Sequence, residues 1–426
     1  MTTGKTALTS IPALNLPVLP NGRHYRFHAM VKPSGSECNI DCEYCFYLHK
    51  ADLLKHPSGS RMSEETLELH ITQYVESQTG EAVVFSWQGG EPTLMGIDFF
   101  ERVVELQKKA AKPGQRIEND LQTNGIALDA TWANFLKQNN FLVGLSVDGP
   151  RALHDFYRKS RNGKPTFDYV VNAAKLLHQT GVPFAALCVV NRQNARHGKA
   201  VYRFLVDEIA ATRVQFTPAV EPRIFKESAP AKMNFAMAPM QNTERTRPGH
   251  PMAIVTDWSV DADDYGQFLC DVWDEWLAHD FGRIHVNLFE TAVAQSAGMP
   301  AQMCTQAEFC GKALAVEHNG DVYSCDHFVY PEYRIGNIKS THLGDLAFSE
   351  TQVKFGMDKR NTLPKQCKEC AYLKLCWGEC PKNRLIKSRD GETGLNYLCS
   401  GLLRFYKHID ADMVRILQHL GLLKSR

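Results

Sequence analysis

The chain has 426 residues, of which 44% are hydrophobic and 22% charged, an ordinary globular composition. Lysine plus arginine (48) and aspartate plus glutamate (47) nearly cancel, so no strong overall field recruits nucleic acid or an anionic membrane surface. No apolar run approaches the roughly 20 residues that span a bilayer. The first 22 residues lack a continuous apolar core and a small-residue cleavage site, so we expect no signal peptide and a cytoplasmic protein.

Thirteen cysteines are unusual for a chain without an export signal. In a reducing compartment, many cysteines indicate metal binding or redox chemistry more often than disulfides. Three of them lie within eight residues near the start, and eight lie between residues 304 and 399. Cys188 and Cys270 stand alone and are expected to be buried packing thiols. The clustered cysteines therefore predict metal centres.

From about residue 26 to residue 218, short β-rich runs alternate with amphipathic helical patterns. This alternation predicts a parallel sheet with crossover helices, an α/β fold. Six such units are too few for a closed eight-fold barrel, so we expect an open, partial (βα)6 TIM-like barrel. Its site should lie at the C-terminal ends of the strands. The expected strands are 27–31, 83–87, 118–123, 142–147, 184–190 and 213–217, and the expected helices are 63–77, 99–111, 129–138, 169–179 and 197–208.

The second half of the chain has a different organisation. Residues 225–257 have no clear period and predict a long insertion or lid, with a flexible surface excursion as the alternative. A helical pattern covers 261–279, and a hairpin is expected around the Asn319-Gly320 turn. We therefore divide the chain into an N-terminal arm (1–24), a barrel with its insertion (25–257), linker helices (258–303), a cysteine-rich module (304–400) and a C-terminal helix (401–426).

Cys38, Cys42 and Cys45 follow the first expected strand in the pattern CxxxCxxC. Three thiolates can hold three irons of a four-iron cluster and leave the fourth iron open. A zinc site completed by a histidine such as His49 is the alternative that the spacing leaves open. With Tyr44 inside it, the motif resembles that of the radical S-adenosylmethionine (SAM) superfamily. In that family SAM binds the open iron, and an electron from the cluster releases a 5′-deoxyadenosyl radical.

Further motifs follow the expected strands in the order found in that superfamily. The segment GGEPT at 89–93 resembles the loop that holds the amino group of SAM through backbone contacts, which glycine permits by allowing close approach. The segments QTNG at 122–125 and SVDG at 146–149 end the next two strands. By resemblance, Ser146 and Arg158 bind the SAM carboxylate. The implied cofactor site comprises Tyr44, Gly89, Gly90, Glu91, Asn124, Ser146, Arg158 and Val220.

Eight cysteines in the C-terminal part suffice for two fully coordinated four-iron clusters. A pair of zinc ribbons is the alternative, although the gaps after Cys370 suit a ribbon poorly. With GDVYSCD at 320–326, the pattern resembles the SPASM extension of peptide-modifying radical SAM enzymes, closest to anaerobic sulfatase-maturating enzymes. By resemblance alone, one auxiliary cluster takes Cys304, Cys310, Cys325 and Cys380, and the other takes Cys367, Cys370, Cys376 and Cys399.

This resemblance implies the oxidation of a sulfatase Cys or Ser to Cα-formylglycine with SAM and three [4Fe–4S] clusters. A radical takes a Cβ hydrogen, a base takes the thiol or hydroxyl proton, and an electron leaves toward an auxiliary cluster. Asp326 is the expected base because it follows Cys325 and, by resemblance, matches the catalytic aspartate of the family. A base must lie within hydrogen-bond reach of its proton. The alternative for Asp326 is a turn residue that accepts backbone hydrogen bonds. Tyr47 is expected to line the same cavity and orient this carboxylate, and Gln88 to contact the substrate.

The resemblance also implies partners and leaves two rival functions. We expect an unfolded sulfatase polypeptide with a CxPxR or SxPxR motif and a flavodoxin- or ferredoxin-like reductant, with no nucleic acid and no membrane. Other SPASM enzymes form thioether or other crosslinks, or mature quinone cofactors. Many of those carry an N-terminal recognition domain, for which the 25 or so residues before the first strand are too short. A zinc-bound or simple electron-transfer protein would leave the glycine loop, Ser146 and Arg158 unused.

Overall fold

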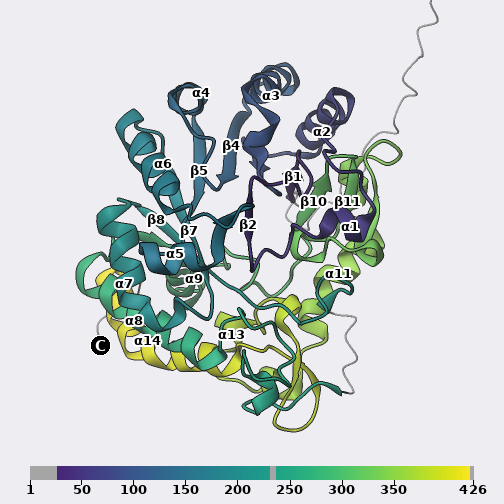
Figure 1. The fold of residues 1–426 in the computed structure, drawn as a ribbon. Coiled ribbons are helices and arrows are strands. Elements are labelled where there is room, and N and C mark those ends of the chain that lie inside the picture. The colour runs from purple at the N-terminus through teal and green to yellow at the C-terminus, as the bar shows by residue number, and fades with distance from the viewer. Residues whose placement is uncertain (1–25, 231–236, 423–426) are drawn as a thin grey trace, which may run out of the picture.

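The computed structural model describes residues 26–230 and 237–422 (Figure 1). The expected N-terminal arm, 1–24, lies outside the described residues. A ten-stranded sheet forms the centre of the molecule. In sheet order its strands are β12 (Arg334–Asn337), β11 (Asp321–Tyr323), β10 (Ala313–Glu317), β1 (His28–Lys32), β3 (Ala82–Trp87), β4 (Arg116–Thr123), β5 (Phe141–Ser146), β7 (Phe184–Val190), β8 (Arg213–Pro218) and β9 (His285–Val286).

Six of these strands, β1, β3, β4, β5, β7 and β8, lie side by side in chain order, and every neighbouring pair is parallel. Each expected strand is present, with its ends displaced by no more than a few residues. Alternate side chains of these strands, such as those of β7, are buried, and helices cover one face of the sheet. The predicted partial (βα)6 barrel is confirmed, and the C-terminal ends of its strands meet at one edge.

The crossover helices lie on the outer side of the barrel, where Figure 1 shows α2, α3, α4 and α6 fanned side by side. Local signals set their ends: Ser63 Oγ accepts a hydrogen bond from Thr66 N at the start of α2, and Gly181 ends α6 with a left-handed φ of 67°. The helices are α1 (Lys50–Leu54), α2 (Glu64–Ser77), α3 (Ile97–Ala110), α4 (Ala130–Gln138), α5 (Arg151–Tyr157), α6 (Phe167–Thr180) and α7 (Gly198–Arg203), the last continuing into a π-helical turn (Phe204–Glu208).

Two small sheets complete the strands. β2 (Ile40–Cys42) pairs antiparallel with β6 (Arg158–Ser160), and this register sets Cys42 opposite Arg158. β13 (Ile386–Lys387) pairs antiparallel with β14 (Thr393–Leu395). The β2–β6 pair therefore holds the first cysteine motif against the segment that follows α5.

The expected hairpin of the cysteine-rich module is present as β10 and β11, joined by the turn that includes Gly320. β10 also pairs in parallel with β1 along its whole length. The barrel sheet therefore continues into the module, and the domain boundaries remain predictions. The module adds the short helices α10 (Leu343–Ala347), α11 (Glu350–Asn361), α12 (Lys365–Lys368) and α13 (Leu373–Cys376).

Three longer helices close the C-terminal side: α8 (Ala262–His279), α9 (Asn287–Ser296) and α14 (Cys399–His419). Figure 1 shows α14 running along α8. The two helices touch through glycines, because a Cβ at Gly401 would lie 1.8 Å from the Ala262 carbonyl oxygen. Within the described part of the chain, no helix is long and apolar enough to cross a membrane.

The described part of the expected insertion, 225–257, packs against the cysteine-rich module. Tyr330 donates a hydrogen bond to the Phe225 carbonyl oxygen at 2.8 Å, and the Lys387 N–H donates to the Pro239 carbonyl oxygen at the same distance. Residues 231–236 lie outside the described residues. A role as a lid remains a prediction.

We predict that Gly401→Ala destabilises the protein by about 1–3 kcal/mol, because a methyl group has no room between α8 and α14. The midpoint of thermal unfolding, followed by circular dichroism, measures this. Ser400→Ala, one residue away, is the matched control and should stay within about 0.5 kcal/mol of the parent. An unchanged midpoint for Gly401→Ala would show that α8 and α14 can move apart without a loss of stability.

Candidate active site

Cys38, Cys42 and Cys45 lie together beyond the end of β1. Cys38 and Cys42 are buried, and the Cys45 N–H donates to the Cys42 carbonyl oxygen at 2.9 Å, which forms a tight turn between them. Burial, followed by the field of Glu91, raises the pKa of Cys38 to about 12, and Cys45 adds to this. Burial also raises the pKa of Cys42, and Cys45 and Cys38 add to this shift. Buried thiols that disfavour each other's ionisation are stable as thiolates when a cation or cluster neutralises them.

The glycine loop after β3 packs directly on the backbone that precedes Cys38. The Gly90 N–H donates to the Gly35 carbonyl oxygen at 2.9 Å, and the Glu91 N–H donates to the Glu37 carbonyl oxygen at 2.8 Å. A Cβ at Gly90 would lie 1.9 Å from that Glu37 oxygen. Glycine is therefore required for this contact, and the loop is fixed beside the cysteine motif.

The carboxylate of Glu91 is buried and bonded entirely within the protein. It accepts hydrogen bonds from the Thr93 N–H and hydroxyl, from the Thr123 hydroxyl at 2.8 Å and from the Asn124 N–H at 2.8 Å. Asn124 in turn donates from Nδ2 to Asn39 Oδ1 at 2.7 Å, beside Cys38. Glu91 thus ties the glycine loop to the end of β4 and positions Asn124.

Arg158 lies against the first cysteine motif through the β2–β6 pairing. Its Nη1 donates to the Tyr44 hydroxyl at 2.8 Å, and that hydroxyl donates to Asp148 Oδ2. Burial alone would lower the pKa of Arg158, but Cys42, Tyr44 and Asp148 raise it well above its usual range. A permanently charged guanidinium therefore faces the cysteines, and it suits a carboxylate ligand.

Three further expected residues line the edge of the barrel. Ser146 is the last residue of β5 and is buried. Val220 is buried after β8, and Gln88 is half-buried directly after β3, with its N–H bonded to the Val31 carbonyl oxygen at 2.9 Å. All three therefore lie at or just after the C-terminal ends of parallel strands, and their roles remain predictions.

The C-terminal cysteines gather into two groups, of which the first lies beside the hairpin. Burial, and then the fields of Cys304 and Cys380, raise the pKa of Cys325 well above its usual range. Burial raises the pKa of Cys310 to about 11, with Lys359 opposing and Cys304 adding to the shift. Cys304, Cys310, Cys325 and Cys380 therefore share one region.

The second group lies around α12, α13 and the start of α14. Burial, and then Cys399 and Cys367, raise the pKa of Cys376 to about 12. Burial, and then Cys367 and Cys370, raise the pKa of Cys399 to about 12. The two groups are the sets that the family resemblance names, and their binding of one cluster each remains a prediction.

The spacing of the sulfur atoms bears on the zinc alternative. Around one tetrahedral zinc ion with Zn–S bonds near 2.3 Å, sulfurs lie about 3.8 Å apart. Among the described residues, no three cysteine sulfurs lie within 4.8 Å of one another, and the one such group of metal-ligating side chains is His56, Glu317 and His318. Thiols that interact electrostatically, with sulfur atoms too far apart to bind one ion, suit a multi-atom cluster better than a single zinc ion.

Asp326 follows Cys325 and forms a buried ion pair with Lys32, the last residue of β1. The Lys32 ammonium also lies 4.6 Å from the centre of the Tyr47 ring, and the Tyr47 hydroxyl donates to Glu317. Burial alone would raise the pKa of Asp326, but Lys32, His327 and Lys50 lower it below its usual value. Asp326 is therefore ionised at neutral pH. We expected Tyr47 to orient this carboxylate, but its ion-pair partner is Lys32, and Tyr47 bonds to Glu317.

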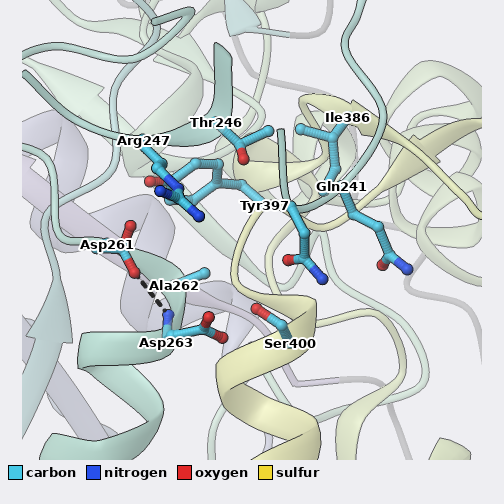
Figure 2. Close-up of a pocket in the computed structure, with 10 residues that line it drawn as sticks. Gln241, Thr246, Arg247, Asp261, Ala262, Asp263, Ile386, Tyr397 and Ser400 are labelled. Carbon is cyan, nitrogen blue, oxygen red and sulfur yellow. Dashed lines mark hydrogen bonds between the residues drawn. The ribbon is translucent and has the colours of Figure 1, made fainter. Parts of the chain in front are cut away.

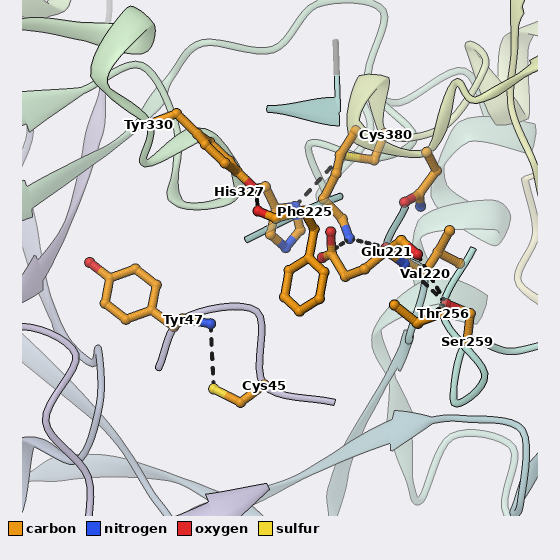
Figure 3. Close-up of polar contacts among 12 residues, drawn as sticks. Cys45, Tyr47, Val220, Glu221, Phe225, Thr256, Ser259, His327, Tyr330 and Cys380 are labelled. Atoms are coloured by element: carbon orange, nitrogen blue, oxygen red, sulfur yellow. Dashed lines mark hydrogen bonds and ion pairs between the residues drawn. The ribbon is translucent and has the colours of Figure 1, made fainter. Parts of the chain in front are cut away.

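A second buried ion pair closes the other side of the site. Lys382 bonds to Glu221 Oε1 at 2.5 Å and to the Val220 carbonyl oxygen. Figure 3 shows Glu221 and Val220 beside the Ser259 hydroxyl, which accepts from the Glu221 N–H at 3.1 Å, and shows His327 contacting Cys380 at 3.6 Å. These contacts join the end of β8 to the cysteine-rich module.

A small polar pocket lies apart from these groups, between the insertion and the starts of α8 and α14 (Figure 2). Arg247, Asp261 and Tyr397 are among the residues that line it, and none of the expected site residues does. The neighbouring hollow is more open and includes Cys399, Arg404 and Lys407. Cys399, a member of the second cysteine group, thus lines a hollow of the surface.

Several side chains of the site were missed from the sequence. Lys32 has a weak signal, since a charged residue ends an otherwise buried strand. Asp148 stands in the SVDG segment and bonds to Tyr44. Glu317, Lys50 and Glu221 have no signal of their own, because only the fold brings them to the site.

The comparisons with known proteins agree with this geometry. The radical SAM superfamily matches residues 33–205, and the SPASM iron–sulfur cluster-binding domain matches residues 304–371. A serine-type anaerobic sulfatase-maturating enzyme of Bacteroides thetaiotaomicron is 43% identical over 382 residues, 90% of this chain and 89% of that protein. The chain belongs to the anaerobic sulfatase-maturating enzymes.

Other members of this family show the same likeness. A cysteine-type anaerobic sulfatase-maturating enzyme of Clostridium perfringens is 32% identical over 92% of this chain and 98% of its own. A solved structure described as native anSMEcpe with bound AdoMet and Cp18Cys peptide superposes with a TM-score of 0.77 at 30% identity, over 92% of this chain and 99% of that chain. The predicted family, fold and enzyme class, a radical SAM oxidoreductase, are confirmed.

Family membership also confirms the predicted cofactors: SAM with its [4Fe–4S] cluster, and auxiliary iron–sulfur clusters. The residues present fit them. The candidate cluster ligands are all cysteine thiols. The backbone at Gly90 packs too closely for any side chain. Arg158 supplies a fixed positive charge for the SAM carboxylate. The assignment of individual residues to each cofactor remains a prediction.

We predict that replacing Cys38, Cys42 and Cys45 by alanine removes about four of about twelve iron atoms per chain, because only the first group loses its ligands. Iron and sulfide analysis with Mössbauer spectroscopy of anaerobically reconstituted protein measures this. Cys188→Ala and Cys270→Ala are matched controls, since both thiols are buried outside the three groups and should keep all the iron. Loss of all the iron from the triple variant would contradict three independent sites.

Proposed function

We propose that this enzyme oxidises a cysteine or serine side chain of a sulfatase polypeptide to Cα-formylglycine. One observation carries the proposal. Asp326 forms an ion pair with Lys32 at the end of β1, directly before the segment that contains the first cysteine motif. Membership of the family supports it, as does the likeness to a relative whose solved structure includes a peptide. A base and a radical-generating motif at one barrel mouth suit a C–H oxidation.

The first cysteine motif and the residues around it hold the cofactor in this proposal. Cys38, Cys42 and Cys45 hold the cluster, and SAM bound to it supplies a 5′-deoxyadenosyl radical as the acceptor of the substrate Cβ hydrogen atom. Arg158 and Ser146 pair with the SAM carboxylate by charge and hydrogen bonding. The loop glycines, Gly89 and Gly90, let the loop pack on residues 35–37 beside the cysteine motif, where the loop backbone would contact the amino group.

Three further residues of the SAM site hold or enclose the groups that bind the cofactor. Asn124 would contact the ribose of SAM, and its N–H is bonded to the Glu91 carboxylate, which fixes its position. Tyr44 links Arg158 to Asp148 and so fixes the guanidinium. Val220 closes the site with an apolar side chain after β8.

The auxiliary sets carry electrons in this proposal. Cys304, Cys310, Cys325 and Cys380 form one set of four thiolate ligands. Four protein ligands leave no iron free for substrate, so such a cluster accepts and passes on an electron. Cys367, Cys370, Cys376 and Cys399 would hold the other cluster, and Cys399 lines a surface hollow, so that cluster would lie nearer to an external electron acceptor.

Asp326 takes the thiol or hydroxyl proton of the substrate residue. Lys32 keeps the carboxylate ionised before the reaction and fixes its direction, since it is paired with Asp326 and buried. Tyr47 forms the adjoining wall, stacked on Lys32 and bonded to Glu317. Gln88, half-buried next to the glycine loop, contacts the substrate backbone.

The partners follow from this chemistry. The substrate is an extended, unfolded sulfatase segment with a CxPxR or SxPxR motif, because a folded sulfatase could not deliver a side chain into the barrel. A flavodoxin- or ferredoxin-like protein supplies the electron that the first cluster needs. Such a reductant is found in the cytoplasm, which is the compartment we propose.

We predict that anaerobically reconstituted enzyme converts CxPxR and SxPxR peptides to the aldehyde without crosslinking them. Asp326→Asn should lower aldehyde formation by about a hundredfold or more, the typical contribution of a general base, while cleavage of SAM continues. Mass spectrometry of the peptide and chromatography of 5′-deoxyadenosine measure the two products separately.

Asp345→Asn, an exposed aspartate on α10, is the matched control and should behave as the parent. Normal aldehyde formation by Asp326→Asn would remove Asp326 from the mechanism. A crosslinked peptide product would instead favour the thioether-forming function.

A further inference from the structure

Lys50 is a buried lysine whose ammonium group has no hydrogen-bond partner among the described residues. It is the first residue of α1, five residues after Cys45, and only 1% of its surface is exposed. A buried ammonium left unsatisfied costs several kcal/mol, on the order of the penalty for an uncompensated buried ion. Such a group persists when something outside the chain satisfies it.

The surroundings of Lys50 place it in the proposed active site. Its Nζ lies 3.3 Å from the centre of the Tyr330 ring, and Tyr330 bonds to Phe225, as Figure 3 shows. Lys50 lowers the pKa of Asp326 through its charge, so the two groups share one region. The Tyr330 ring holds the ammonium by a cation–π contact on one side and leaves its N–H donors unused.

The surroundings of Lys50 compensate its charge only weakly, so a ligand oxygen would favour the ammonium form. Burial lowers the pKa of Lys50 to about 7, and although Glu221 and Asp326 oppose this, Lys382 adds to it. Glu221 is already paired with Lys382, and Asp326 with Lys32. The two carboxylates that act most strongly on Lys50 are therefore each paired with another lysine, and Glu332 opposes the shift less than they do. The Lys50 N–H donors remain available for a ligand oxygen.

We propose that the Lys50 ammonium donates a hydrogen bond to the side-chain oxygen of the substrate residue, and thereby favours serine over cysteine. The inference rests on the proposed function and adds a substrate preference to it. A serine hydroxyl accepts a charge-assisted hydrogen bond well, whereas a thiol sulfur is a weak acceptor. A thiol with a pKa of about 8.5 gives up its proton readily, whereas a serine hydroxyl requires activation.

The reaction balances with Lys50 as an electrostatic group only. The Cβ–H and O–H bonds of serine break, and a C=O double bond forms. The hydrogen atom goes to the SAM-derived radical, the proton to Asp326 and the remaining electron to an auxiliary cluster. Lys50 gains and loses no atom, and stabilises the negative charge that grows on oxygen as its proton leaves.

The test compares matched SxPxR and CxPxR peptides on the reconstituted full-length enzyme and on Lys50→Met, an uncharged side chain of similar length. We expect the parent to oxidise the serine peptide at least as fast as the cysteine peptide. In Lys50→Met, serine turnover should fall at least about tenfold, a loss of about 1.4 kcal/mol. Cysteine turnover should fall less than about threefold, so the ratio of the two rates reverses. Lys50→Arg, which keeps the charge, should recover part of the serine rate.

Two further measurements separate this role from a structural one. Lys50→Met should unfold at a higher temperature than the parent, because a buried uncompensated charge has been removed. An AxPxR peptide, which has no reacting side chain, should bind both proteins with the same Kd. Lys175→Met, an exposed lysine on α6, is the control for losing a lysine elsewhere.

A selective loss of serine turnover with unchanged AxPxR binding supports the inference. An equal loss on both peptides, an unchanged ratio, or a parent that prefers cysteine overturns it while leaving the proposed function intact. A parent that oxidises neither peptide overturns the proposed function, and the inference falls with it.

Discussion

Strand β10 lies beside β1 although almost the entire barrel separates them in the chain, and the parallel pairing sets Lys32 opposite Glu317. This register brings the hairpin and Cys325 to the mouth of the barrel. It also places Asp326 within reach of Lys32, and Tyr47 within reach of Glu317. Without this pairing, the auxiliary module would hold its cysteines but would supply no carboxylate to the barrel.

Buried charges rather than apolar contacts define the geometry of the site. Glu91 ties the glycine loop to β4, Lys32 clamps Asp326, and Lys382 joins the cysteine-rich module to Glu221. A buried ion pair contributes little net stability compared with apolar residues of the same shape, but it fixes direction once formed. Charges arranged in this way orient the reacting groups. The free energy lost by burying them is offset by the large apolar core of the barrel.

Most of the barrel could be predicted from the sequence because its signals are local. Strands such as β7 are continuous apolar runs, and the cysteine and glycine motifs directly follow strand ends whose position the fold fixes. The pairing of β1 with β10 could not be predicted, since the expected hairpin already satisfied β10 on one side. The role of Lys32, and with it the correction to Tyr47, depends on that long-range pairing. Lys50 was missed for a similar reason: its helix position predicts exposure, and only Tyr330 and the surrounding module bury it.

The glycine contact between α8 and α14 has a consequence for how the protein matures. Gly401 touches Ala262 and lies two residues after Cys399, so the docking of the last helix delivers that thiol to its group. The second C-terminal group therefore has its four thiols together only after α14 has packed on α8, and a cluster in that group would be fully enclosed only from that stage of folding.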